Sequence, residues 1–431
     1  MYDVLILGGG AAGFYAAIHI AEADPQLKVA IIERGKEGLG KVKVSGGGRC
    51  NVTHAEFDPR ELVKNYPRGE KELLGPFHTY CSGDTVAFFE ERGIALKIEP
   101  DGRMFPTTNS SQTIIDCLVS EIDRLGVKVL RNSSVTGFAK VFEDENQDSS
   151  IWSVETIRGA YNAKNLLVCT GSNPKIWEML KKMGHTIVPP VPSLFTFNIK
   201  DDRISGISGV STYARINIVS SKGHLDKFHA ALKKYSLQLS DLETEGPLLI
   251  THWGMSGPGI LRLSAWGALF LNELDYKFTI RVNWLPSYYE GSIINKLQQI
   301  KELEGKKTVL RTKCFDLPKR LWSSLVKASG ITEADKWADI TKVQLQDLAK
   351  ELTECQFRVD GKSTFKEEFV TAGGIDLKEI NFKTYESKLN PSLYFAGEII
   401  NVDAITGGFN FQNAWTGAYI AAQGIVKNTK S

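Results

Sequence analysis

The stretch DVLILGGGAAGFYAAIHIAEA, residues 3–23, decides the fold. It opens with a short apolar run that ends directly in glycines, which is typical of a buried parallel strand. Residues 11–23 are rich in helix-forming side chains, and the pair Asp24–Pro25 ends that helix. A second apolar run, KVAIIE at 28–33, completes a strand–helix–strand unit. We therefore expect an α/β fold with a Rossmann-like domain.

The glycines of this stretch match the dinucleotide fingerprint G-x-G-x-x-G at Gly8, Gly10 and Gly13. Gly8 permits the tight turn, Gly10 lets a pyrophosphate approach the backbone, and Gly13 allows the helix to pack closely on the strand. The start of the helix offers free N–H groups to a phosphate. Glu33, at the end of the second strand, would accept hydrogen bonds from a ribose, and its charge disfavours a 2′-phosphate. The fingerprint alone does not separate FAD from NAD.

A second glycine cluster lies in KVKVSGGGRCN, residues 41–51. No fingerprint precedes a helix there, so we expect Gly46–Gly48 to be bare backbone beside the pyrophosphate of a long cofactor. Arg49 would neutralise phosphate or orient an anionic substrate. Cys50 has no nearby cysteine partner, so a packing residue is favoured over a redox thiol.

The C-terminal stretch LYFAGEIINVDAITGGFNFQNAWTGA, residues 393–418, points to a flavin. Glu398 ends a predicted strand, where a carboxylate can bind the hydroxyl groups of a ribityl chain. A helix that starts near Phe411 could place its positive end beside the pyrimidine edge of a flavin. The alternative is a glycine turn before an ordinary terminal helix.

Two further stretches contain candidate catalytic residues. In THWGMSGPGILRLS, residues 251–264, His252 and a helix that starts at Pro258 could bind a carbonyl or carboxylate, and His252 could donate a proton. A structural turn with a hydrogen-bonded histidine is the alternative. In TAGGI, residues 371–375, Thr371 would donate to the substrate or lie in a turn beside the flavin.

Composition excludes several classes of protein. The chain has 431 residues, 42% hydrophobic, and a net charge of +2, which predicts neither a nucleic-acid partner nor a membrane surface. Its six cysteines are scattered, and the histidines form no ligand cluster, so we expect no metal site. The N-terminus lacks a basic region before its apolar run. We expect a reduced, cytoplasmic protein.

These motifs resemble a bacterial family of NAD(P)/FAD-dependent oxidoreductases that includes aminoacetone oxidases and reductases of 3-dehydro-bile acids. The resemblance rests on GGGAAG, SGGGRCN, THWGMSGPGILRLS, TAGGI, the C-terminal stretch and DGRMFP at 101–106. It implies a Rossmann-like FAD-binding domain interrupted by an inserted β-barrel-like piece and a small helical piece. Changes in residue character place the FAD-binding domain at 1–190 and 356–431, and the insertion at 191–355, β-rich over 191–285 and helical over 286–355.

The fingerprint and the resemblance together give a set of candidate FAD contacts. They are Gly8, Gly10, Ala11, Ala12, Gly13, Glu33, Arg34, Lys41, Ser45, Gly46, Gly47, Gly48, Arg49, Cys50, Asn51, Val135, Thr170, Gly171, Gly397, Glu398, Asp403, Gly407, Gly408, Asn410, Phe411 and Gln412. The sequence departs from the family after Gly171, where a glycine-rich loop looks shortened, and at His54, where asparagine is common.

We expect an FAD-dependent oxidoreductase that exchanges a hydride between flavin N5 and a small organic substrate. No second fingerprint for a nicotinamide is present, so NADH or NADPH would bind transiently, or oxygen would accept the electrons from an amine or alcohol substrate. A flavin-dependent RNA modifier and a flavin-binding protein without turnover are the remaining alternatives. The low net charge counts against the RNA modifier.

Overall fold

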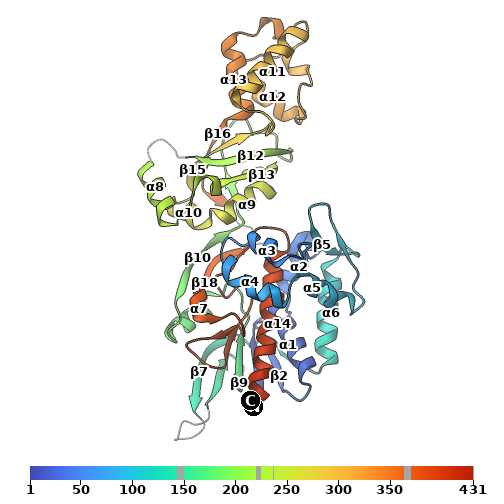
Figure 1. The fold of residues 1–431 in the computed structure, drawn as a ribbon, viewed down its shortest axis with the longest axis vertical. Coiled ribbons are helices and arrows are strands. Elements are labelled where there is room, and N and C mark those ends of the chain that lie inside the picture. The colour runs from blue at the N-terminus through green and yellow to red at the C-terminus, as the bar shows by residue number, and fades with distance from the viewer. Residues whose placement is uncertain (143–149, 220–224, 236, 364–369, 431) are drawn as a thin grey trace. The chain divides into compact units, whose positions relative to one another are not determined.

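The computed structural model describes residues 1–142, 150–219, 225–235, 237–363 and 370–430 (Figure 1). The chain divides into two compact units, Met1–Val191 with Lys366–Ser431 as unit 1 and Pro192–Phe365 as unit 2. Among the described residues, no helix combines the length and the apolar character needed to cross a membrane.

Unit 1 is built on a nine-stranded mixed sheet. Its central part runs in the order β21-β9-β1-β2-β6, and these five strands are parallel to one another. A hairpin arm of β7 and β8 and the short antiparallel strands β19 and β20 extend the sheet. The strands are β1 (Tyr2–Leu7), β2 (Val29–Ile32), β6 (Lys128–Leu130), β7 (Val135–Phe142), β8 (Ser150–Thr156), β9 (Gly159–Val168), β19 (Ile380–Asn381), β20 (Glu386–Ser387) and β21 (Leu393–Phe395).

Two helices from opposite ends of the chain, α1 (Ala11–Ala23) and α14 (Phe409–Lys430), lie side by side against this sheet (Figure 1). Both are buried along most of their length, which explains why their sequences are rich in Ala, Ile and aromatic residues rather than amphipathic. The strand–helix–strand unit predicted over 3–33 and the terminal helix are therefore confirmed. The other helices of unit 1 are α2 (Gly40–Gly48), α3 (Pro59–Leu62), α4 (Glu70–Thr79), α5 (Ser82–Glu90), α6 (Ser111–Arg124) and α7 (Pro174–Lys182).

A small antiparallel sheet in unit 1 was not predicted. It has the order β3-β5-β4 and consists of β3 (Thr53–His54), β5 (Arg103–Pro106) and β4 (Leu96–Ile98). These strands are two to four residues long, which is too short for alternation of polar and apolar residues to indicate them. A separate two-stranded sheet pairs β10 (Ile187–Ser193) with β18 (Val370–Ile375).

Unit 2 contains a seven-stranded sheet in the order β16-β15-β12-β13-β14-β11-β17. The paired strands form an open path, so a closed barrel stays a prediction. The strands are β11 (Thr196–Asn198), β12 (Ser211–Val219), β13 (Glu243–Ile250), β14 (Gly254–Ser256), β15 (Lys277–Asn283), β16 (Cys355–Asp360) and β17 (Lys362–Ser363). Helix α8 (Leu225–Lys234) lies between β12 and β13 in sequence, and α9 (Pro258–Trp266) and α10 (Ala268–Glu273) lie between β14 and β15.

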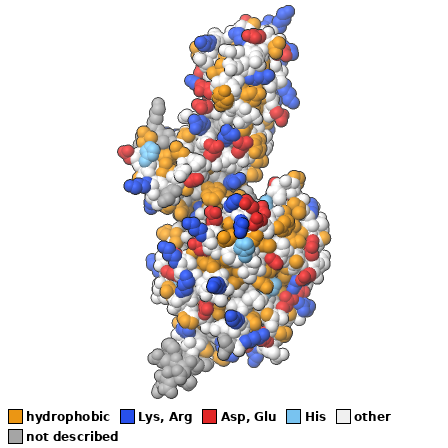
Figure 2. Space-filling model, viewed as in Figure 1, with side chains coloured by type: hydrophobic (Ala, Val, Ile, Leu, Met, Phe, Trp, Pro, Cys, Tyr) orange, Lys and Arg blue, Asp and Glu red, His pale blue; other side chains and the backbone are white. Residues whose placement is uncertain are grey.

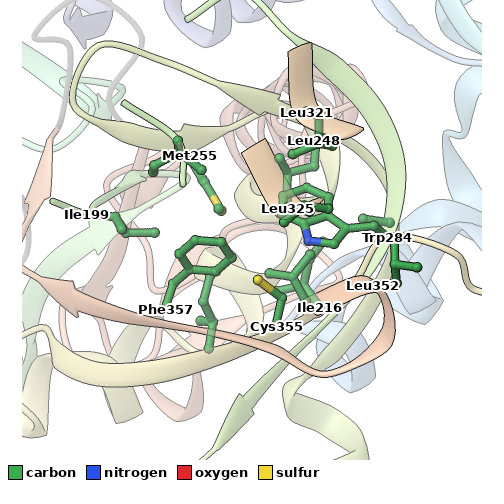
Figure 3. Close-up of a cluster of buried hydrophobic side chains, with 14 of the residues drawn as sticks. Ile199, Ile216, Leu248, Met255, Trp284, Leu321, Leu325, Leu352, Cys355 and Phe357 are labelled. Carbon is green, nitrogen blue, oxygen red and sulfur yellow. The ribbon is translucent and has the colours of Figure 1, made fainter. Parts of the chain in front are cut away.

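The helical piece predicted over 286–355 is present as α11 (Glu290–Leu303), α12 (Lys319–Ala328) and α13 (Lys342–Thr353). Its side chains share one hydrophobic core with the sheet, where Trp284 lies beside Leu325 and Leu352 (Figure 3). Because β16 and β17 pair with β15 and β11, unit 2 extends past the predicted boundary at residue 355, to Phe365.

Candidate functional site

The candidate site in unit 1 lies where parallel strands end. The carboxyl ends of β21, β9, β1 and β2 share one edge of the sheet, and ligands of open α/β sheets bind at this edge. Residues predicted to contact FAD directly follow each of these strands: Gly397 and Glu398 after β21, Thr170 and Gly171 after β9, the fingerprint after β1 and Glu33 after β2.

The three fingerprint glycines differ in what surrounds them. A methyl group on Gly8 would lie 2.5 Å from the carbonyl oxygen of Cys169, and Gly8 has a φ of +106°. A methyl group on Gly13 would overlap the carbonyl oxygen of Gly8. At Gly10, by contrast, no atom of the described residues lies within 4 Å of such a group. The turn role of Gly8 and the packing role of Gly13 are confirmed, and the bare space at Gly10 fits an approaching pyrophosphate.

The Glu33 carboxylate is fixed by backbone donors. The N–H of Gly9 donates to Oε2 at 2.8 Å, and the N–H of Gly35 donates to Oε1 at 2.6 Å. The chain after Glu33 returns to the fingerprint, because the N–H of Leu39 donates to the Gly9 carbonyl at 2.7 Å. Each carboxylate oxygen keeps further lone pairs, so the predicted ribose contact fits this geometry. Arg34 next to it is exposed.

The second glycine cluster interrupts helix α2. Ser45 is extended, and Gly46 and Gly47 are left-handed with φ of +57° and +69°. Gly48 follows with a φ of +81°. No atom of the part of the chain that the structure describes lies within 4 Å of a methyl group built on Gly47, so the space there is open among these residues. This open, side-chain-free surface fits the predicted passage of a cofactor.

Two residues that follow the cluster are engaged within the protein. The Arg49 guanidinium pairs with Glu99 at 2.5 Å and lies 3.9 Å from the centre of the Phe105 ring. The predicted phosphate or substrate contact of Arg49 would therefore have to compete with Glu99. Cys50 is fully buried, and burial raises the pKa of its thiol to about 12. It stays protonated at neutral pH, as a packing residue would.

Glu398, Lys41 and Thr371 come together although they are distant in sequence. The Lys41 ammonium bonds to Oε2 of Glu398, and the N–H of Thr371 donates to Oε1 at 2.9 Å. A methyl group on Gly171 would lie 3.6 Å from the same carboxylate. The structure therefore places one predicted catalytic residue, Thr371, among predicted cofactor contacts.

The start of α14 is attached to the strand that follows the second glycine cluster. Thr53 Oγ1 donates to Gln412 Oε1 at 2.6 Å, and Trp415 Nε1 donates to the Val52 carbonyl at 2.9 Å. A methyl group on Gly408 would lie 2.9 Å from Asn51 Oδ1. The predicted glycine cluster and the predicted C-terminal motif thus belong to one site.

Some predicted contacts have mainly structural partners. The Asp403 carboxylate is fully buried and pairs with the Arg68 guanidinium through two of its nitrogens. Asn410 exchanges two hydrogen bonds with the backbone of Ala404. The Gln412 side chain also binds Thr85 and Thr416 and is completely buried. These three side chains, which were predicted to contact FAD, already have hydrogen-bond or ion-pair partners within the protein.

The remaining predicted contacts are placed by the backbone. Ala11 and Ala12 open α1, and Ala12 lies against Gly397, where an added methyl group would be 3.3 Å away. Val135 begins β7 at an irregularity in its pairing with β8. Phe411 stacks on Trp415 with ring centres 5.6 Å apart.

Four buried oxygens provide a test of whether a cofactor fits. Thr170 Oγ1, Thr371 Oγ1, Asn51 Oδ1 and Asn413 Oδ1 have no hydrogen-bond partner among the described residues. A buried polar atom left unpaired costs about 1–3 kcal/mol, so such atoms call for a partner. FAD carries hydroxyl groups and an N–H on its ring that can pair with them. The residues present therefore fit FAD.

Asn413 and the strand Thr53–His54 were missed by sequence reasoning. Asn413 lies in the first turns of α14, next to Gln412, and the orphaned oxygen is visible only once its burial is known. Thr53 and His54 follow the glycine cluster in sequence, and their role depends on contacts with residues more than 350 positions away.

The other predicted catalytic residue, His252, belongs to unit 2. It lies in the hairpin between β13 and β14, which is held by the N–H of Thr251 donating to the Gly254 carbonyl at 2.8 Å. His252 is exposed, and Trp253 beside it is 67% exposed. No hydrogen bond to the His252 ring occurs within the described part of unit 2. Its catalytic role stays a prediction.

Comparisons with known proteins identify the family of the chain. The model of the HI0933-like protein Rossmann domain family matches residues 2–424. The ribosomal RNA dihydrouridine synthase of Haemophilus influenzae is 28% identical over 98% of both chains. The 3-dehydro-bile acid delta(4,6)-reductase of Clostridium scindens is 27% identical, again over 98% of both chains.

A solved structure shows a similar fold. The 3-ketosteroid-delta4-(5alpha)-dehydrogenase of Rhodococcus jostii aligns over 99% of this chain and 96% of its own, with a TM-score of 0.50 and 13% identity. At that identity, the likeness concerns the fold alone.

Proposed function

This chain belongs to the HI0933-like Rossmann-domain family and is an FAD-dependent oxidoreductase, and we propose that it reduces a carbon–carbon double bond conjugated with a carbonyl group. The proposed substrate is a small organic molecule, and the proposed electron donor is NADH or NADPH.

The proposal is carried by what the full-length relatives have in common. A dihydrouridine synthase saturates a ring double bond of uracil that is conjugated with a ring carbonyl. A 3-dehydro-bile acid delta(4,6)-reductase is named for the reduction of double bonds in a steroid that carries an oxidised position 3. The substrates differ widely in shape, but the bond that is reduced has the same chemistry in both.

The residues of this chain would divide the work as follows. Glu33 would hold the ribose, and the free N–H groups at the start of α1 would face the pyrophosphate. Glu398, oriented by Lys41 and by the N–H of Thr371, would bind hydroxyl groups. FAD, when bound, supplies hydride chemistry at its N5 atom. His252 would donate the proton that completes the reduction.

Anaerobic kinetics with a conjugated-ketone probe substrate test the proposal. With NADH or NADPH, a steroid carrying a 3-keto-4-ene should be reduced at the double bond and not at the carbonyl. The His252→Asn variant should lower kcat about a hundredfold with little change in KM. His229→Asn, another exposed histidine of unit 2, is the matched control. Flavin that is reduced by an amine or alcohol, and by neither nucleotide, would overturn the proposal in favour of an oxidase.

A second candidate substrate is a uridine in RNA, because two full-length relatives, from Haemophilus influenzae and Escherichia coli, carry that activity in their names. The net charge of +2 hides a difference between the units. Residues 192–365 carry 24 Lys and Arg against 19 Asp and Glu, whereas the rest of the chain carries 28 against 31. Charges of both signs are nevertheless interspersed on the visible face (Figure 2).

The basic surplus is densest in RTKCFDLPKR, residues 311–320. Arg311, Lys313, Lys319 and Arg320 are exposed and form no ion pair within the described residues. Lys319 and Arg320 lie in the first turn of α12, where the helix dipole disfavours cations by about 0.3–1 kcal/mol. Such an arrangement favours an anionic partner.

Salt-dependent binding of a uridine-containing RNA separates the two candidates. If RNA is the substrate, binding should weaken steeply with salt, and Lys319→Gln with Arg320→Gln should reduce the slope by about 2. Lys181→Gln with Lys182→Gln in α7 is the control pair. Binding too weak to measure at low salt would leave the small-molecule substrate as the proposal.

A further inference from the structure

His54 connects the small sheet of unit 1 to the turn before α14. Its Nδ1 donates to the Gly407 carbonyl at 3.0 Å, across 353 residues of sequence. Its ring stacks on the Phe409 ring, with centres 4.4 Å apart and an angle of 27°. One side chain thus binds both the backbone and the first side chain of the turn.

The surrounding glycines leave room for this ring. A methyl group on Gly102 would overlap His54 Nε2, and Gly102 has a φ of +82°. A methyl group on Gly407 would lie 2.5 Å from the Phe409 ring and 3.4 Å from His54 Nδ1. Neither glycine can gain a side chain without displacing the imidazole or its stacking partner, so the ring has a defined place.

The hydrogen bond to Gly407 determines how the next amide points. In a trans peptide the C=O and the following N–H point in opposite directions. Because the Gly407 carbonyl points at His54, the N–H of Gly408 points away from it. This N–H makes no hydrogen bond within the described residues, and it extends the row of free donors at the start of α14.

We propose that His54 is a positioning residue that orients the Gly407–Phe409 turn and thereby sets the affinity and the reduction potential of bound FAD. The inference rests on the proposed FAD site at the start of α14. Donors held in a fixed direction favour negative charge on the group they face. A turn released from His54 would lose part of that preference, so the potential of the bound cofactor would fall.

Two substitutions separate the donor from the ring. His54→Asn places an amide N–H where Nδ1 lies but removes the ring. His54→Phe keeps a ring for stacking on Phe409 but removes the donor. His78→Asn, on an exposed position of α4, is the control. Three quantities are measured for each purified variant: the FAD dissociation constant, the midpoint potential of bound FAD and the melting temperature of the apoprotein.

The proposal predicts opposite rankings. His54→Phe should weaken FAD binding about tenfold and lower the midpoint potential, whereas His54→Asn should stay within about twofold of the wild type in affinity, with an unchanged potential. The apoprotein should instead be less stable with Asn than with Phe, because the stacking is lost.

Losses of affinity that follow the losses of apoprotein stability in both variants would overturn the proposal, because His54 would then act by packing alone. Failure of the wild-type protein to bind FAD would contradict the proposed cofactor site itself, and not only the role of His54.

Discussion

The two glycine clusters of unit 1 look alike in sequence but are needed for different physical reasons. In Gly8–Gly13, two of the glycines are required because protein backbone fills the space that a side chain would take. In Gly46–Gly48, the backbone is left-handed, and the space around Gly47 is open. The glycines of the first cluster are needed mainly for close packing, with open space at Gly10. Those of the second cluster are needed for their left-handed backbone, with open space at Gly47. In the proposed FAD site, only the bare parts would face the cofactor.

Gly13→Ala should have the largest effect. The added methyl group would overlap the Gly8 carbonyl, so α1 would have to move away from β1. We expect a loss of about 3 kcal/mol in the unfolding free energy, measured by urea denaturation of the apoprotein. A midpoint equal to that of the wild type would show that α1 does not pack as described.

His19, in the middle of α1, should make unit 1 sensitive to acid. Burial lowers the pKa of its imidazole to about 3, below the ordinary 6.5, so the folded state holds it neutral. Below pH 6.5 the His19 imidazole binds a proton in the unfolded chain but stays neutral in the folded chain. Stability should therefore fall by about 1.4 kcal/mol per pH unit as the pH drops from 6.5 towards 3.

The His19→Phe variant keeps the aromatic contacts with Tyr15 and Phe88 and removes the titration. Urea unfolding at pH 7 and pH 5 should give a smaller difference for the variant than for the wild type, by about 2 kcal/mol. Equal differences in the two proteins would contradict a neutral, buried His19.

Gly10→Ala should separate binding from folding. None of the described residues occupies the space of the new methyl group, so the unfolding free energy of the apoprotein should change by no more than about 1 kcal/mol. FAD affinity, measured by titration of the apoprotein, should fall about tenfold because the pyrophosphate can no longer approach. Unchanged FAD affinity would show that Gly10 does not lie against the pyrophosphate.

Gly47 tests the conformational cluster. Alanine at a φ of +69° should cost about 1–2 kcal/mol, whereas asparagine, which tolerates this conformation, should cost less. Thermal melting of the apoprotein would rank the wild type, Gly47→Asn and Gly47→Ala in that order. The opposite order of the two variants would mean that the space is less open than described.

The sequence allowed prediction of those parts of the site that depend on neighbours in the chain. The fingerprint, Glu33 and the terminal helix follow from short patterns, and all three are where they were predicted. The pairing of Arg49 with Glu99 and of Asp403 with Arg68 could not be predicted, because each joins residues 50 or more positions apart. For the same reason, Arg49 and Asp403 were predicted to contact the cofactor, although each forms an ion pair within the protein.

The contacts of α14 with β3 illustrate the same limit. Thr53 and His54 show no pattern of their own, since a two-residue strand has no periodicity. Their importance follows from a helix that lies at the other end of the chain. The side-chain oxygens of Thr371 and Asn413 could be recognised as candidate cofactor contacts only from the structure. It shows that both are buried without a hydrogen-bond partner among the described residues.

We propose that the ends of β1, β9 and β21, the second glycine cluster and the start of α14 form one FAD site. An absorbance spectrum of the purified protein, with mass identification of the released cofactor, tests it most directly. We expect flavin absorbance corresponding to one FAD per chain, which bleaches when NADH or NADPH is added without oxygen. A colourless protein that cannot be reconstituted with FAD would contradict it.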